Sequence, residues 1–149
     1  MNSTYVQYVT NFIYNMSIKE KLVEVDRIDD PELLHVIMFN YNWDDGFELP
    51  KLVLKNEKCQ LSTALLIFYL AGGDEFLLEK QEISNSKSER IRFISQLYNN
   101  IISNIYQKGK IYFEPLLTKV EVYKLKKILT NSEQVFIEPF REEKVEFSV

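Results

Sequence analysis

The chain has 149 residues, of which 46% are hydrophobic and 27% are charged; this is an ordinary globular composition and is enough for a core without disulfides. The single cysteine, Cys59, excludes an internal disulfide framework and suits a reducing cytoplasm. The first residues lack a basic segment followed by an apolar run, and no apolar run approaches the roughly 18 residues of a membrane span. We therefore expect a cytoplasmic protein with no signal peptide and no membrane partner.

The net charge of −4 is unevenly distributed along the chain. Residues 1–83 carry 7 basic and 14 acidic side chains, residues 84–130 carry 9 and 3, and residues 131–149 carry 2 and 5. An acidic field over more than half of the chain disfavours nucleic acid as a partner and favours cationic protein surfaces. The alternative is ordinary charge scatter on a solvated surface.

Helical spacing of apolar residues begins near the first residues and predicts three helices before residue 42. The first apolar stripe comprises Tyr5, Val9, Phe12, Ile13 and Met16. Ser17 and Glu20 form a capping-box pattern that predicts the start of a second, short helix. Asp30 followed by Pro31 predicts the start of a third helix, which runs to Tyr41.

Two more helices are expected after residues 40–50. Pro50 is expected to open a helix that ends at Lys55. Ser62 is expected to cap a strongly apolar helix over residues 64–71, which has the composition of a central buried helix and ends at Gly72.

The remaining sequence predicts a short helix over 74–79, a polar linker over 85–88, and a clear amphipathic helix over 91–105 that Gly109 closes. A last helix is expected over 116–129. It bears a lysine cluster made of Lys119, Lys124, Lys126 and Lys127. Because acidic segments flank this cluster, we interpret it as a solvated helix face and expect no nucleic-acid partner.

An internal similarity with a shift of 29 residues places residues 36–39 on 65–68 and 45–47 on 74–76. Each copy consists of an apolar helix, an acidic turn and a shorter helix, which is typical of stacked helical hairpins. Chance similarity of apolar runs is the alternative. We predict an all-α, repeat-like stack of hairpins in a single domain over 1–149, with a motif-bearing hairpin pair at 30–80 and an extended tail at 134–149.

Residues 40–50 hold the only tryptophan, Trp43, beside an acidic pair, Asp44 and Asp45. A structural interpretation has Asp45 capping the next helix with Glu48 in capping-box register, Gly46 adopting a positive φ and Trp43 fixing the turn on the core. In a functional interpretation the two carboxylates act as acid and base, hold a cation, or bind a partner. Adjacent carboxylates rarely converge on one point, and a hard cation needs more oxygen ligands.

His35 and Cys59 are each the only residue of their type. A catalytic base needs an orienting partner and a nucleophile, and the spacing of this sequence supplies neither. One histidine and one cysteine do not make a zinc site. We therefore interpret both as structural residues and predict neither metal nor cofactor.

The motif Tyr-Asn-Trp-Asp-Asp-Gly-Phe at residues 41–47, followed by Cys59 and the segment 61–71, resembles a bacterial family of small helical domains of unknown function. The resemblance covers roughly residues 30–80, and the stretch 71–75 departs modestly from the family pattern. It implies no catalytic residues. The motif positions Asn42, Trp43, Gly46 and Phe47 are expected to be structural markers.

Small acidic helical proteins of this kind are similar to immunity proteins of contact-dependent or polymorphic bacterial toxin systems. The leading hypothesis is a protein that binds and neutralises a cationic toxin domain, such as a nuclease, through Asp44, Asp45, Asp74 and Glu75. The alternatives are a small enzyme or metal-binding protein that uses Asp44, Asp45 and His35, or a passive scaffold. The sequence leaves the oligomeric state open.

Overall fold

The computed structural model describes residues 3–83 and 88–141. Over these residues the chain forms eight α-helices, two short 3-10 helices and one isolated β-bridge, so the predicted all-α fold is confirmed. The helices are α1 (Ser3–Asn15), α2 (Ile18–Val25), α3 (Pro31–Phe39), η1 (Trp43–Asp45), α4 (Glu48–Lys55), α5 (Leu61–Leu70), α6 (Gly73–Ile83), α7 (Glu89–Ile102), α8 (Lys119–Ile128) and η2 (Ser132–Phe136).

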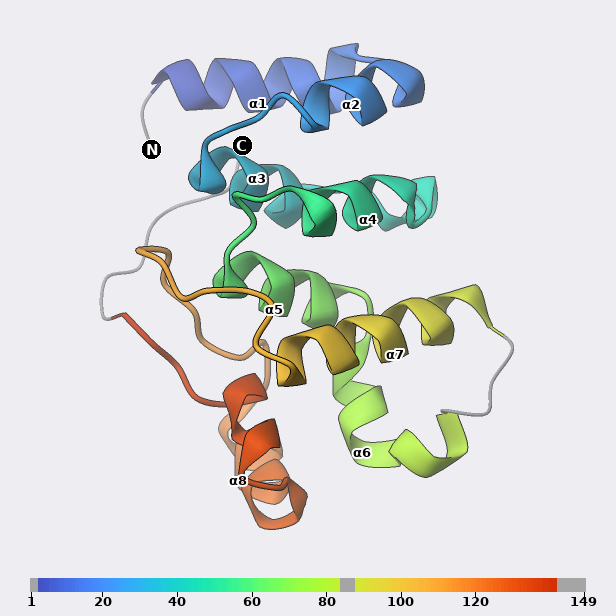
Figure 1. Cartoon of the computed structure of the whole chain (residues 1–149), viewed down its shortest axis with the longest axis vertical. Helices are drawn as coiled ribbons and strands as arrows, with labels where there is room; N and C mark the ends of the chain where they lie inside the picture. Colours follow the sequence, from blue (N-terminus) through green and yellow to red (C-terminus); the bar gives the residue numbers. More distant parts are fainter. Residues whose placement is uncertain (1–2, 84–87, 142–149) are drawn as a thin grey trace.

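Helices α1 to α5 stack in chain order, α7 lies beside α5, and α6 lies on the far side of α7 (Figure 1). On one side of the stack α3 packs between α1 and α5. On the other side α2 packs on α4. Helix α7 then packs on α5 and α6, and η2 packs on α7. One hydrophobic core cluster contains buried residues from Val9 in α1 to Ile137 after η2. The arrangement is a stack of helical hairpins to which the C-terminal segment is added.

Helices α2 and α3 begin where local capping chemistry places them. The Ser17 hydroxyl accepts a hydrogen bond from the Glu20 amide, and the Glu20 carboxylate accepts one from the Ser17 amide, so the predicted capping box is present. Asp30 caps α3 by accepting a hydrogen bond from the Glu32 amide, and Pro31 is the first helical residue.

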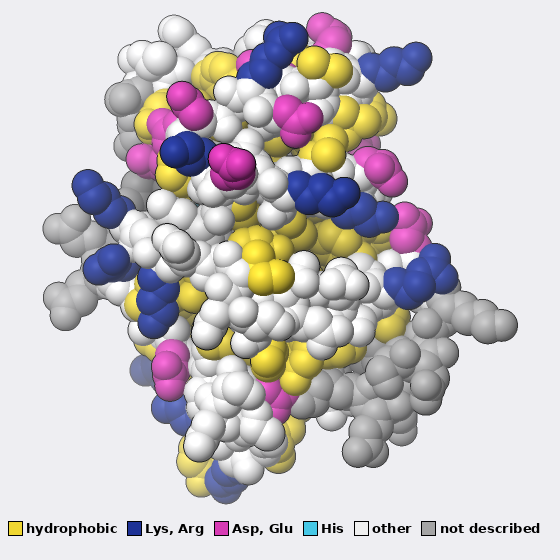
Figure 2. Space-filling model, in the orientation of Figure 1, with side chains coloured by type: hydrophobic (Ala, Val, Ile, Leu, Met, Phe, Trp, Pro, Cys, Tyr) yellow, Lys and Arg dark blue, Asp and Glu magenta, His cyan; other side chains and the backbone are white. Residues whose placement is uncertain are grey.

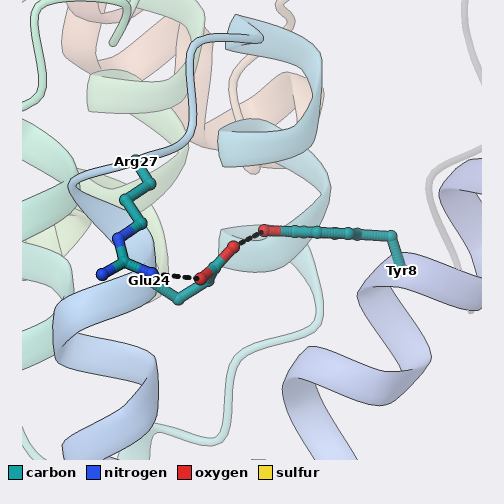
Figure 3. Close-up of polar contacts among 3 residues, drawn as sticks. All are labelled: Tyr8, Glu24 and Arg27. Atoms are coloured by element: carbon teal, nitrogen blue, oxygen red, sulfur yellow. Dashed lines mark hydrogen bonds and ion pairs between the residues drawn. The ribbon is translucent and has the colours of Figure 1, made fainter.

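Tyrosine–carboxylate hydrogen bonds tie α1 to the elements that follow it. The Tyr8 hydroxyl donates to Glu24 of α2 at 2.8 Å, and the second oxygen of Glu24 lies 4.0 Å from Arg27 (Figure 3). The Tyr5 hydroxyl donates to Asp30, the residue that caps α3. These two contacts fix α1 against α2 and against the start of α3.

Asn56 joins α4 to the loop between α2 and α3. Its side-chain amide nitrogen donates to the carbonyls of Val25 at 3.0 Å and Ile28 at 2.9 Å, while its side-chain oxygen accepts from the Lys58 amide at 2.9 Å. One side chain thus satisfies two carbonyls and one amide of the loops at this edge of the stack.

Helix α5 is buried on all sides, as its apolar composition predicts, and only Leu70 at its end is exposed. Its polar groups bind the C-terminal half of the chain: the Leu61 amide donates to the Gln107 carbonyl and the Ser62 hydroxyl donates to the Ile111 carbonyl. The prediction that Ser62 caps this helix is therefore wrong. Gln60 occupies the cap position, and the Ser62 hydroxyl is engaged in a tertiary hydrogen bond.

Helix α6 departs from the repeat that the sequence predicts. Its place in the chain corresponds to that of α4, but α5 and the first part of α6 meet at an angle of 80°. No single helix of the described ranges is long and apolar enough to cross a membrane; α5 and the first part of α6 reach that length and composition only as a bent pair, and α5 is buried in the core. Because α6 turns away, α7 packs on α5.

The ends of the last helices differ from the predictions. Helix α7 ends at Ile102, before the predicted residue 105, because Asn104 adopts a φ of 58° and so breaks the helix without Gly109. Helix α8 begins after Thr118, which forms a capping box with Glu121, rather than at residue 116.

The predicted extended tail is wrong at its start. Residues 132–136 form the helix η2, and among residues 134–141 only Phe140 pairs in an extended bridge, with Phe113. Residues 142–149 lie outside the described ranges. The buried carboxylate of Glu133 holds η2 in place, because it accepts hydrogen bonds from the Tyr98 hydroxyl of α7 and from the amide and hydroxyl of Thr130.

We expect Asn56→Asp to lower the free energy of unfolding by about 1–3 kcal/mol, because the substitution removes two donors and places a carboxylate against two carbonyls. It keeps the oxygen that accepts from Lys58. Urea denaturation at neutral pH measures the effect. Asn11→Asp, the same change at an exposed position of α1, is the control, and equal stabilities of the two variants would contradict the prediction.

Candidate functional site

The turn at residues 40–47, named the Trp43 turn below, is held by its own backbone and by two side chains. The Tyr41 hydroxyl donates to the Gly46 carbonyl at 2.7 Å, and the Asn42 side-chain oxygen accepts from the Asp44 amide at 3.1 Å. Gly46 has a φ of 91°, as predicted, which an L side chain rarely adopts. The turn geometry is therefore specified by Tyr41, Asn42 and Gly46.

An aromatic cluster packs the Trp43 turn onto α7. The Trp43 ring centroid lies 5.2 Å from Tyr41, 6.1 Å from Phe47 and 6.4 Å from Phe93 of α7, and Phe47 lies 4.9 Å from Phe93. Edge-to-face and tilted contacts at these distances are favourable for aromatic pairs. The cluster confirms that Trp43 fixes the turn on the core, and it identifies Phe93 as a partner that no local sequence signal indicates.

The carboxylates of the turn do not have the capping role that the sequence predicts. Asp45 lies inside η1, and α4 begins after Phe47, which makes no side-chain capping bond. The predicted capping box between Asp45 and Glu48 is therefore absent. Asp44, Asp45 and Glu48 are all exposed, so three carboxylates within five residues of sequence face solvent in η1 and at the start of α4.

The second acidic pair, Asp74 and Glu75, lies in the first turn of α6. Arg90 of α7 reaches it: one guanidinium nitrogen donates to the Ala71 carbonyl at 3.2 Å, and the other lies 3.8 Å from Glu75. Gly72 adopts a φ of 99° beside this guanidinium. Asp74 is half-buried.

Both acidic turns thus meet the first turns of α7, one through Phe93 and the other through Arg90. The first turn of α7 takes part in a second ion pair, since Lys51 of α4 lies 4.0 Å from Glu89. Of the four predicted acidic residues, Asp44 and Asp45 are the two fully exposed ones outside these ion pairs.

His35 is a buried residue of the α3–α5 interface. Its Nδ1 lies 2.9 Å from the Thr63 hydroxyl of α5. Burial lowers the pKa of His35 to about 4, so the ring is neutral at pH 7. This environment is that of a structural histidine.

Cys59 is also buried, and burial raises the pKa of its thiol to about 12. A thiol with this pKa is a poor nucleophile at neutral pH. Among residues 3–83 and 88–141, no three His, Cys, Asp or Glu side chains are grouped so that they could hold a metal ion. The described geometry therefore gives no support to a metal site built from Asp44, Asp45 and His35.

We expect Trp43→Phe to change the free energy of unfolding by no more than about 1 kcal/mol, whereas Trp43→Ala costs about 3 kcal/mol or more. The indole nitrogen is shielded from solvent and has no acceptor among the described residues, so phenylalanine loses contact area but no hydrogen bond. Urea denaturation of both variants measures the difference. A loss for Trp43→Phe as large as that for Trp43→Ala would contradict it.

We expect the free energy of unfolding to fall as the pH falls from 6.5 towards 4, by about 1.4 kcal/mol per pH unit at most. In this window the unfolded chain protonates His35, whose ordinary pKa is 6.5, while the folded chain does not. Urea denaturation between pH 5 and 7 measures the slope, and His35→Asn should flatten it. An unchanged slope in that variant would contradict the prediction.

A family model matches part of the chain. No curated protein and no solved structure matched the chain. The matched segment begins at Asp29, next to the residue that caps α3, and ends with Ile102, the last residue of α7. It is longer than the predicted span of 30–80 and includes Arg90 and Phe93 as well as the Trp43 turn. Residues 29–102 match the family described as "Domain of unknown function (DUF4274)".

Proposed function

We propose that this protein binds another protein through the carboxylates of the Trp43 turn. The observation that carries the proposal is the exposure of Asp44 and Asp45 on a turn whose geometry other residues maintain, with the exposed Glu48 directly after it at the start of α4. Charges at such positions can be changed without loss of the turn, so their concentration there favours a role in recognition over a role in folding.

The partner that fits this surface is cationic. Residues 1–83, which include the turn, carry twice as many acidic as basic side chains. Opposite charges on two proteins raise the rate at which they associate, and aromatic residues at the centre of the contact slow their dissociation. The rings of Tyr41, Trp43 and Phe47 are half-buried beside the carboxylates and supply such aromatic surface.

We propose further that the complex neutralises a bacterial toxin domain, so that the protein acts as an immunity protein. Nuclease toxins need basic surfaces to hold phosphates, and an acidic protein that covers such a surface excludes the nucleic acid. The proposal rests on an analogy of size, acidic charge and helical fold with immunity proteins, and on the exposed carboxylates. It assigns Asp74 and Glu75 a secondary role, because Arg90 balances Glu75.

Co-expression tests the proposal. The protein would be tagged and produced together with the product of the gene directly upstream, which for an immunity protein should encode the toxin. We expect a complex that is weakened by high salt and that restores growth to cells producing the neighbouring protein.

Asp44→Lys/Asp45→Lys should abolish protection and weaken the complex at least tenfold, because it reverses both charges on the turn. Glu57→Lys/Glu138→Lys, an equal charge change at exposed positions outside the turn, is the matched control and should retain protection. Circular dichroism checks that both variants are folded. Full protection by the folded Asp44/Asp45 variant would remove this surface from consideration.

A further inference from the structure

A groove lies between α4 and α7, on the face of the stack shown in Figure 2. Its volume is about 640 Å³, which lies within the range of specific binding sites. Apolar side chains gather in the hollow, and dark-blue cationic side chains lie beside it (Figure 2). The apolar lining consists of Leu54, Phe93, Leu97, Ile105 and Tyr106.

The groove forms because α4 and α7 face each other but pack mainly on other helices. Helix α4 packs on α2, whereas α7 packs on α5 and α6. Near the first turn of α7 the two walls are joined by the Phe47–Phe93 contact and by the ion pair of Lys51 with Glu89. Beyond this point the facing side chains of α4 and α7 line an open channel.

Each wall presents side chains at helical spacing. Helix α4 contributes Lys51 and, one turn later on the same face, Leu54 and Lys55. Helix α7 contributes a stripe that begins at Glu89 and ends at Asn100. At 1.5 Å per residue this stripe is about 16 Å long, or three helical turns. Ile105, whose side chain is 59% exposed, lies at the far end.

The charge of the groove is opposite to that of the Trp43 turn. Its lining residues include three cations, Lys51, Lys55 and Arg92, and one carboxylate, Glu89. An apolar floor with cations on both walls complements a ligand that has an apolar stripe flanked by carboxylates.

A helix fits this groove better than an extended peptide does. An extended peptide needs backbone partners, such as the edge of a sheet, for its amide and carbonyl groups. The groove offers side chains from two helices instead. A helix satisfies its own backbone and can insert apolar residues at positions i, i+3, i+4 and i+7.

We propose that the α4–α7 groove binds an acidic amphipathic helix of a partner protein, with the apolar stripe of that helix over the half-buried Leu54 and the exposed Ile105 and its carboxylates beside Lys55 and Arg92. This surface is separate from the carboxylates assigned to the cationic partner, so either proposal can fail without the other. The matched segment 29–102 contains both walls of the groove.

Fluorescence anisotropy with a designed peptide tests the proposal. The probe is a fluorescein-labelled helical peptide of about 16 residues, with leucines at i, i+3, i+4 and i+7 and glutamates on both sides of them. We expect saturable binding to the full chain, with amide chemical-shift changes confined to α4, α7 and residues 105–106. The same peptide with lysine in place of glutamate should bind at least tenfold more weakly.

Lys55→Glu/Arg92→Glu should weaken binding of the acidic peptide at least tenfold at low salt, and the difference should shrink near 1 M salt, where charges are screened within about 3 Å. Lys19→Glu, an exposed charge reversal on α2, should bind as the wild type does. Equal affinity for the acidic and basic peptides, undiminished binding by the folded double variant, or no saturation up to about 1 mM would each overturn the proposal.

Discussion

The burial of α5 on all sides is the constraint on which the other elements depend. A helix with no solvent face must have a partner in every direction, and each polar group on it needs a hydrogen bond. Thr63 meets His35 of α3, Ser62 meets the chain after α7, and the Tyr69 hydroxyl donates to the Phe136 carbonyl of η2 at 2.5 Å. The order of the hydrogen-bonding side chains on this helix thus determines which segment covers which side.

The position of α7 links the core to both proposed surfaces. The 80° turn between α5 and α6 leaves room on α5, and α7 occupies it. From there Phe93 supports the Trp43 turn and Arg90 supports the turn after α5, while the outward face of α7 forms one wall of the groove. One helix therefore positions an acidic turn and a cationic groove side by side on a single stack.

The features that could be predicted from the sequence are those set by interactions between residues close together in the chain. The starts of α2 and α3 could be predicted because Ser17 and Asp30 bind amides two or three residues away. The starts of α4 and α5 could not, because aromatic packing against Phe93 and a bond from Ser62 to a distant carbonyl override local capping chemistry. The Trp43 turn could also be located from the sequence, because its hydrogen bonds join residues only two to five positions apart. The contact with Phe93 of α7 could not, because nothing in the sequence around Phe93 indicates it.

Sequential stacking also governs how the molecule comes apart. Because α1 contacts α3, and α3 contacts α5, each hairpin depends chiefly on its immediate neighbour, as in solenoid proteins with nearest-neighbour energetics. Fraying of α1 and α2 removes one outer layer and leaves the faces of α5 covered by α3 and α7. Opening at α5, in contrast, separates the first two hairpins from the C-terminal segment in a single step. Because α4 packs mainly on α2, loss of this outer layer would also loosen the α4 wall of the groove, so both surfaces depend on the N-terminal layer as well as on α5.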